Sequence, residues 1–430
     1  MIQQFCLQRK RLIGIMLYTF LSVIFFPENA FSQGGSNYSI FGIGDIIYGG
    51  GAAYQSMGGS QIAIPSSNNI NMLNPALWSL VSTTRLQAGY RFNQNVVSSS
   101  TDELWQNNGG LNGFSSLFNF DTSRQMSAVI LFQPVSTVNY FMASPIEVQK
   151  DETLIEGKNL YKGSGGLSAL TIGFSSKIFD FLYLGGAFSG VFGQIKNNTN
   201  IDFSSDYTTN YTVRHTEVME AYSYKLGVYL NPIENLGIGA FYEYISDANL
   251  DIKNEYSYPI SLGTQSNPLI KKKEINSSKK TSMPQYVGFG LSYIFNKKLM
   301  IASDYLLGKF SDLYSNYSND VKFRDMQRFS FGINRLGNPN PYASLVDRFS
   351  YKIGAYYEQL YYTIKDIDMN EIALTAGLQL PLSRYAQVDL AFVFGTRGQA
   401  TDGLVRENFL RFIIDISVGD TWFKRLRRSY

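Results

Sequence analysis

The sequence predicts an all-β protein: a fourteen-stranded antiparallel β-barrel that crosses a membrane and holds an N-terminal segment in its lumen. Three observations support this prediction. Of the 430 residues, 44% are hydrophobic and 15% aromatic, while only 17% are charged, a balance that suits strands better than helices. Apolar and polar residues alternate with a period of two through most of the chain. The alternating stretches are about ten residues or longer, the length of a tilted strand across a bilayer.

The N-terminus has the pattern of a secretory signal peptide over residues 1–32. Basic residues at 9–11 precede an apolar run from Leu12 to Phe26, and small residues follow in Ala30–Ser32. The run is shorter than the roughly 20 residues that a membrane-spanning helix needs, so a retained membrane anchor is the less favoured alternative. We therefore expect cleavage near Ser32 and, together with the barrel, a location in the bacterial outer membrane.

Residues 33–83 are predicted to form a hatch, a compact plug inside the barrel. The stretch Met57–Trp78 contains too much Gly, Asn, Ser and Pro for a regular strand or helix. An apolar segment without regular structure needs an enclosing wall, and the strands that follow can supply one. The apolar side chains that need this burial are Met57, Ile62, Ile64, Ile70, Met72, Leu73, Leu77 and Trp78.

Residues 84–423 are predicted to form the barrel wall. In the last strand, apolar residues alternate from Leu410 to Val418, with Arg411, Asp415 and Ser417 on the other face. A wall that contacts lipid must also be closed, because unpaired backbone groups cannot face hydrocarbon. Twelve or sixteen strands are compatible with the pattern, and the fourteen spans we predict are 84–97, 111–120, 125–147, 163–176, 180–196, 213–230, 235–252, 284–296, 298–312, 323–335, 348–362, 368–381, 385–398 and 404–419.

Short and long connections alternate along the predicted wall, which places the short turns in the periplasm and the long loops outside. One periplasmic turn, Leu336–Val346, is long. The most polar connection, 253–283, carries lysines at 271–273 and 279–280. It is either a solvated tip or a surface that attracts lipopolysaccharide phosphates or another anion. The basic tail, 424–430, is expected in the periplasm, near anionic lipid or docked on a partner.

Several kinds of chemistry lack the residues that they need. The single cysteine, Cys6, lies in the predicted signal peptide, and His215 is the single histidine, which excludes cysteine and histidine-cluster metal sites. The glycines at 49–51 and 58–59 lack the Lys-Ser/Thr that follows a nucleotide-binding glycine loop. A formal charge of +3 gives no reason to expect nucleic acid as a partner. We expect no enzyme activity, no cofactor and no metal.

Charged residues also occupy positions that the alternation places on the lumen side. An unpaired charge would be costly to bury there, so each should find a partner or contact water. Two interpretations stay open: salt bridges that brace the lumen, or a polar path for water or a fatty carboxylate. The residues concerned are Lys225, Glu243, Asp304, Glu358, Asp389, Arg411 and Asp415.

The N-terminal region resembles a known family. Residues 39–45 read Ser-Ile-Phe-Gly-Ile-Gly-Asp, Met57 is followed by two glycines, and Asn74, Pro75 and Ala76 follow further on. This order resembles the FadL-like outer-membrane proteins, which transport long-chain fatty acids and other hydrophobic compounds, in a variant associated with Bacteroidetes-type bacteria. The resemblance implies a fourteen-stranded barrel with an N-terminal hatch that carries an Asn-Pro-Ala tripeptide.

The resemblance also implies roles for particular residues. The tripeptide Asn74, Pro75 and Ala76 would contact a kink in the third strand, and Gln133 and Pro134 lie in the third predicted span. Because proline cannot donate to a ladder, this position is either a lateral opening in the wall or a simple bulge. The apolar hatch residues that would hold the ligand are Met57, Met72, Leu73, Leu77 and Trp78.

These expectations define a passive outer-membrane channel for long-chain fatty acids or other hydrophobic small molecules, gated by the hatch. Its expected contacts are membrane lipid, lipopolysaccharide and the ligand. The alternative is a FadL-like barrel that does not transport and serves type IX protein secretion as a partner or carrier subunit. A general aqueous porin is a third interpretation, against which the hatch argues.

Overall fold

The structure is a computed structural model, which describes residues 34–99, 102–121, 124–150, 153–203, 211–260, 269–313, 320–401 and 403–421. The predicted signal peptide and basic tail lie outside these residues. The chain from Gly34 onward forms one compact unit.

A closed antiparallel barrel of fourteen strands forms the wall, as predicted. Four spans are each made of two consecutive strands, and the last strand of the chain pairs with the first strand of the wall, which closes the barrel. The strands are β2 (Thr84–Ser98), β3 (Glu103–Asp121), β4 (Met126–Pro134) with β5 (Ser136–Lys150), β6 (Thr153–Phe179), β7 (Leu182–Phe203), β8 (Tyr211–Ile233), β9 (Leu236–Ile245) with β10 (Ala248–Ile260), β11 (Leu269–Thr281) with β12 (Gln285–Phe295), β13 (Leu299–Lys309), β14 (Val321–Phe323) with β15 (Met326–Arg335), β16 (Ser350–Ile364), β17 (Ile367–Pro381), β18 (Ala386–Gly398) and β19 (Arg406–Asp420).

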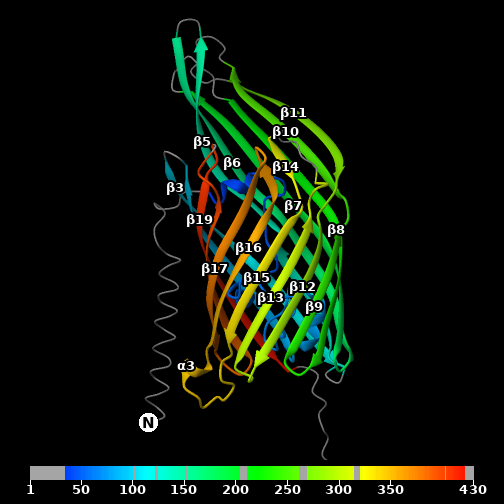
Figure 1. Cartoon of the computed structure of the whole chain (residues 1–430). Helices are drawn as coiled ribbons and strands as arrows, with labels where there is room; N and C mark the ends of the chain where they lie inside the picture. Colours follow the sequence, from blue (N-terminus) through cyan, green and yellow to red (C-terminus); the bar gives the residue numbers. More distant parts are fainter. Residues whose placement is uncertain are drawn as a thin grey trace, which may run out of the picture. The chain divides into compact units, whose positions relative to one another are not determined.

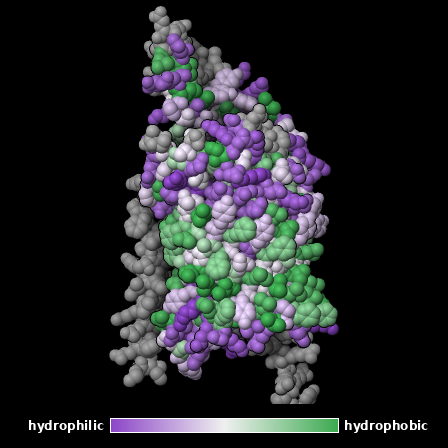
Figure 2. Space-filling model, viewed as in Figure 1, coloured by the Kyte–Doolittle hydropathy of each residue, from purple (hydrophilic) through white to green (hydrophobic). Residues whose placement is uncertain are grey.

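The outer face of this wall is apolar and the inner face is polar, the reverse of a soluble protein. On β8, Leu226 is 66% exposed whereas its neighbour Lys225 is only 7% exposed and faces the lumen. On the face seen in Figure 2, hydrophobic residues gather in a band across the lower half of the barrel, and mostly hydrophilic residues lie above it. A continuous apolar belt on a closed wall is the arrangement that a bilayer requires.

Several hairpins continue as paired strands well beyond the predicted spans. Residues 98–110, 148–162 and 253–283 lie between the predicted spans and were therefore predicted to be loops. They are largely strand in the structure, so this prediction was wrong. The physical reason is visible in residues 271–278, which are all exposed: a strand with both faces in water needs no apolar alternation. Figure 1 shows β10 and β11 rising from the same end of the barrel as β5 and β6.

The opposite end of the barrel is closed by short turns. Asn235 and Asn296 lie there with φ values of 77° and 47°, a left-handed conformation that asparagine tolerates in tight hairpins. The long turn predicted at Leu336–Val346 leads into a short helix, α3 (Leu345–Arg348), which Ser344 caps. None of the helices in the described ranges is long and apolar enough to cross a bilayer.

The segment from Gly34 to Thr83 lies inside the barrel. Its regular elements are short: η2 (Asn37–Ile40), β1 (Asp45–Ile46), α2 (Ala52–Gln55) and η3 (Pro75–Leu80). Wall glycines make room for it, because a side chain on Gly185 or Gly227 would overlap Pro75. The predicted apolar set is buried, at no more than 8% exposure for each member: Met57, Ile62, Ile64, Ile70, Met72, Leu73, Leu77 and Trp78.

Candidate functional site

The ladder of the barrel wall is interrupted between β3 and the β4–β5 span. Strand β3 pairs with β2 over nearly all of its length, but it pairs with β4 only from Phe114 onward. Strand β4 ends at Pro134, and β5 begins at Ser136 after one extra residue. No ladder joins Glu103–Gly113 of β3 to β5 among the described residues. We call this interruption the gap.

Local sequence explains why the ladder stops here. Pro134 has no N–H to donate, which confines proline to the edges and breaks of a sheet. On β6, Gly165 and Gly166 lie opposite the break with φ values of 113° and 131°, a conformation that residues with a Cβ rarely adopt. The ladder between β6 and the β4–β5 span shifts by one residue across this point. Gln133 and Pro134 therefore do mark a break in the third span.

The N-terminal segment closes the gap by bonding to the free edge of β5. Strand β1 pairs with β5 in antiparallel register, so that Ile46 lies opposite Ser136. The N–H of Ile47 donates to the carbonyl of Val135 at 2.9 Å. Further along, the N–H of Asn139 donates to the hydroxyl of Ser39 at 3.0 Å. The polypeptide that seals the wall is thus a part of the luminal segment.

A cluster of buried charges holds this closure to strands β17, β18 and β19, which continue the wall beyond β3 and β2. Arg397 of β18 donates to the carboxylate of Asp45 at 2.6 Å, to Glu371 of β17 at 2.7 Å, and to the hydroxyl of Ser36 at 2.9 Å. Ser36 in turn donates to Glu407 of β19 at 2.7 Å. We call Ser36, Asp45, Glu371, Arg397 and Glu407 the latch. It ties the residues that seal the gap to three wall strands.

Two tyrosines reinforce the latch. The hydroxyl of Tyr361 lies 2.7 Å from the carbonyl oxygens of both Phe41 and Gly44 and donates to one of them at a time. Tyr38 donates to the carbonyl of Val405. Burial, together with the nearby carboxylate of Glu407, raises the pKa of Tyr38 to about 12. Tyr38 therefore stays a neutral donor over the physiological pH range.

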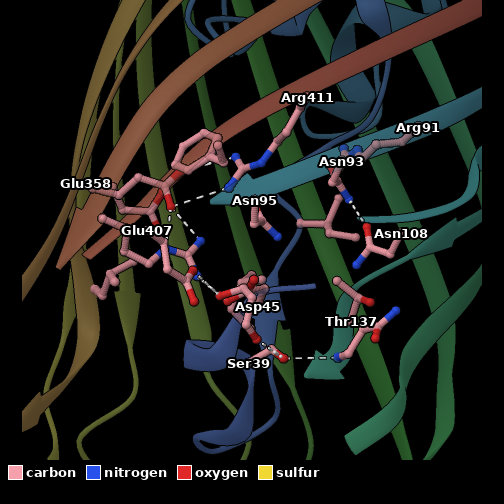
Figure 3. Close-up of a pocket in the computed structure, with 18 of the residues that line it drawn as sticks. Ser39, Asp45, Arg91, Asn93, Asn95, Asn108, Thr137, Glu358, Glu407 and Arg411 are labelled. Carbon is pink, nitrogen blue, oxygen red and sulfur yellow. Dashed lines mark hydrogen bonds and ion pairs between the residues drawn. The ribbon is translucent and has the colours of Figure 1, made fainter. Parts of the chain in front are cut away.

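A cavity of about 60 Å³ lies beside the latch and the gap. Figure 3 shows Arg91, Asn95 and Arg411 of the wall around the same space as Asp45. The guanidinium of Arg411 lies 3.2 Å from Glu371. One water molecule needs only about 10–15 Å³ of such space, and the polar lining suits water. The cavity is charged rather than apolar, which is not the lining expected of a hydrophobic binding pocket.

The predicted tripeptide lies away from the gap. The side-chain amide of Asn74 donates to the carbonyls of Ile62 at 2.8 Å and Val228 of β8 at 3.0 Å. Its oxygen accepts the N–H of Ala76, which caps η3. Pro75 packs against glycines of β7 and β8. The structure therefore does not bring Asn74–Ala76 together with Gln133 and Pro134.

The other predicted hatch residues are spread over the lumen. Met72 lies beside Gly113 of β3, next to the point where the β3–β4 ladder starts, and a Cβ at Gly113 would crowd its side chain. The indole N–H of Trp78 donates to the carbonyl of Asn71 at 2.6 Å. Leu77 packs with aromatic side chains of β7 and β8, and Met57 packs on β15 and β16. Leu73 belongs to a separate, large cluster of buried hydrophobic residues that also contains Tyr48. None of these residues lines the cavity beside the latch.

All seven charged residues predicted on the lumen side are buried or paired there. Lys225 lies 3.0 Å from Glu243 and Arg328 lies 2.8 Å from Glu358. Asp304 accepts two backbone N–H groups of the luminal segment, at 2.6 and 2.8 Å. The sequence reasoning missed Arg397, Glu371 and Glu407, although the alternation could have found them. Arg397 is eight residues from the inward-facing Asp389, on the same face of β18.

These features define a class of protein: a membrane β-barrel with a plugged lumen and a wall gap that its own N-terminal segment seals. The chain belongs to the BamG family, whose sequence model matches residues 10–428. A comparison with curated proteins found no match.

Solved structures share this fold. The toluene transporter TodX of P. putida is 15% identical, with a TM-score of 0.61 over 86% of this chain and 98% of that chain. A Pseudomonas aeruginosa FadL homologue is 11% identical, with a TM-score of 0.59 over 87% and 99%. The Ralstonia pickettii toluene transporter TbuX is 13% identical, with a TM-score of 0.56 over 86% and 98%. The FadL-like fold is therefore confirmed.

Proposed function

We propose that this protein is a bacterial outer-membrane channel for hydrophobic small molecules, which leave the lumen sideways through the gap. The observation that carries the proposal is the gap itself, a stretch of wall sealed by the luminal segment instead of by a neighbouring strand. The structures of similar fold include proteins described as toluene transporters and a monoaromatic hydrocarbon channel. Long-chain fatty acids are the second ligand class that we propose.

Passage would be passive and would need no chemistry. An apolar ligand gains about 0.8 kcal/mol for each CH₂ group that leaves water. To open the route, the ligand must bind the open state more tightly than the closed state, because only this difference shifts the equilibrium. The movement that opens the gap would separate β1 from β5 and release Asp45 and Ser36 from Arg397. Residues 34–47 would thus act as the gate.

A disulfide across the closure tests this gate. Ile46→Cys with Ser136→Cys places two thiols at directly opposed positions, the arrangement that suits a disulfide. With Cys6 in the predicted signal peptide, the mature chain would contain no competing thiol. We expect oxidation to suppress uptake of labelled toluene and oleate into cells that express the pair, and reduction to restore it.

The matched control is Thr171→Cys with Ser189→Cys, which joins β6 to β7 where the two hydroxyls are already 2.8 Å apart. This bond does not cross the closure, so oxidation should leave uptake unchanged. If the oxidised Ile46–Ser136 pair passes ligand as fast as the reduced pair, the gap is not the route. If neither form takes up more ligand than cells without the protein, the channel proposal is wrong altogether.

The small size and the charged lining of the luminal cavity favour a second candidate function. The cavity is small and charged, and the latch consists of buried ion pairs, which favours a permanently sealed barrel. In that case the protein would serve type IX protein secretion as a partner or carrier subunit. Purification from native membranes separates the two: a stoichiometric protein partner, held equally by the oxidised Ile46–Ser136 pair, supports this second function.

A further inference from the structure

Strand β11, in the β10–β11 hairpin that extends beyond the predicted spans, has one unpaired edge. All thirteen of its residues pair with β10, from Leu269 opposite Ile260 to Thr281 opposite Ala248. On its other side, β11 forms no ladder with any strand in the described part of the chain. Residues 271–278 are exposed on both faces. Figure 1 shows β11 beside β10 in the part of the sheet that rises above the barrel.

The same strand carries an excess of positive charge on both faces. Lys271 and Lys273 lie on one face, and Lys272 and Lys280 lie on the other, since side chains alternate along a strand. None of these four has an acidic partner within salt-bridge distance among the described residues. The single acid of β11, Glu274, lies 3.4 Å from Lys253 of the neighbouring strand. The one acid of β11 is therefore paired, and Lys271, Lys272, Lys273 and Lys280 are left for another partner.

We propose that the free edge of β11 is a docking site for an acidic, extended polypeptide segment that adds to the sheet as one more strand. A row of unpaired backbone N–H and C=O groups is a template for such an addition. Lysines above and below the edge would flank the incoming strand on both faces and match acidic side chains there. The proposal is independent of whether the barrel conducts anything.

Charge also argues against two other occupants. A second copy of the same edge would place lysine rows against one another, and edge lysines are a known defence against such self-pairing. A lipid phosphate would neutralise the lysines but would leave the backbone edge without a partner. Figure 2 shows hydrophilic residues over this part of the barrel, above the hydrophobic band, so the edge lies outside the bilayer core. An acidic strand is the one occupant that uses both features.

The test uses the full chain in detergent and a fluorescent decapeptide, Glu-Glu-Thr-Val-Glu-Glu-Thr-Val-Glu-Glu, which presents Glu on both faces when it is extended. Fluorescence anisotropy should show binding that falls about tenfold when Lys272→Glu and Lys273→Glu are combined, because two attractions become repulsions. The matched control combines Lys297→Glu with Lys298→Glu at the opposite end of the barrel, where Lys297 is already paired with Glu234. This control should bind the peptide like the wild type.

Two further peptides separate strand addition from simple charge attraction. Each has the same sequence but is N-methylated at one of the two alternate sets of amides. Strand addition predicts that one set abolishes binding and the other is tolerated, because only alternate N–H groups face the edge. If both methylated peptides bind like the parent, the surface attracts anions without pairing, and the proposal is wrong. It is equally wrong if lipopolysaccharide vesicles bind and the peptide does not.

Discussion

Arg397→Met should release the N-terminal closure while the barrel stays folded. The substitution keeps a long apolar stem but removes the guanidinium, which is 5% exposed and holds Asp45, Glu371 and Ser36. Removal of one partner from a buried ion pair costs about 3–5 kcal/mol, because the remaining charge is left buried without compensation. We expect most of this cost to appear as local opening of residues 34–47, the part that can move into water.

The assay is hydrogen–deuterium exchange of the full chain in lipid nanodiscs. Each 1.36 kcal/mol is a factor of ten, so exchange of peptides from 34–47 should accelerate by about 10²- to 10³-fold. The ladder between β6 and β7 should exchange as in the wild type. The control is Arg335→Met, whose side chain is 50% exposed and lies 3.5 Å from Asp347; such a surface pair contributes at most about 1 kcal/mol.

Two results would contradict the latch. If exchange of 34–47 in Arg397→Met stays within threefold of the wild type, Arg397 does not hold the closure. If all wall peptides accelerate together, the Arg397→Met variant has lost the barrel. The Asp45→Asn variant then becomes the test of the latch. That substitution leaves the wall pair of Arg397 and Glu371 intact, so it should loosen only 34–47; unchanged exchange there would also refute the latch.

Three further substitutions test how the luminal segment is held. Asn74→Ala removes three hydrogen bonds, among them the side-chain donor to the buried carbonyl of Ile62, at about 3 kcal/mol; exchange of residues 57–80 should rise about 100-fold. Gly185→Ala puts a Cβ into the backbone of Pro75 and should lower stability to denaturant by about 1–3 kcal/mol. Gly190→Ala on the same strand meets open space and should be neutral; equal effects would refute the close approach. Tyr361→Phe removes the hydroxyl that donates to the carbonyl of Phe41 or of Gly44 and should speed exchange of 41–44 about tenfold. Unchanged exchange would show that this hydroxyl contributes nothing.

The barrel was predictable because its wall has one lipid face along its whole length. Apolar and polar residues alternate so regularly over Leu410–Val418 that the sequence predicts both the strand and the face of it that contacts lipid. In the structure, β19 spans Arg406–Asp420. The extensions were not predictable by the same reasoning. In β11, Ser277 and Ser278 lie among exposed residues on both faces, so no period distinguishes this strand from a polar loop.

The closure was only partly predictable, because its partners are far apart in sequence. Pro134 signals a break by its own chemistry, and the structure places the break there. Which residues fill it cannot be read locally: Asp45 meets Arg397 across more than three hundred positions. Asn74 likewise suggests a cap, since it precedes Pro75, and it caps η3. Its second contact, with the carbonyl of Val228, depends on tertiary packing.

The latch sets a lower limit on the ligands that could open the gap. If the opening costs about 3–5 kcal/mol, a ligand that gains about 0.8 kcal/mol per CH₂ must bury the equivalent of about four to six more CH₂ groups in the open state than in the closed state. A monoaromatic hydrocarbon would barely meet this requirement, whereas a long-chain fatty acid would exceed it. Because Asp45→Asn weakens the latch, it should increase uptake of toluene more than uptake of oleate. An equal increase for both ligands would place the rate-limiting step elsewhere than at the latch.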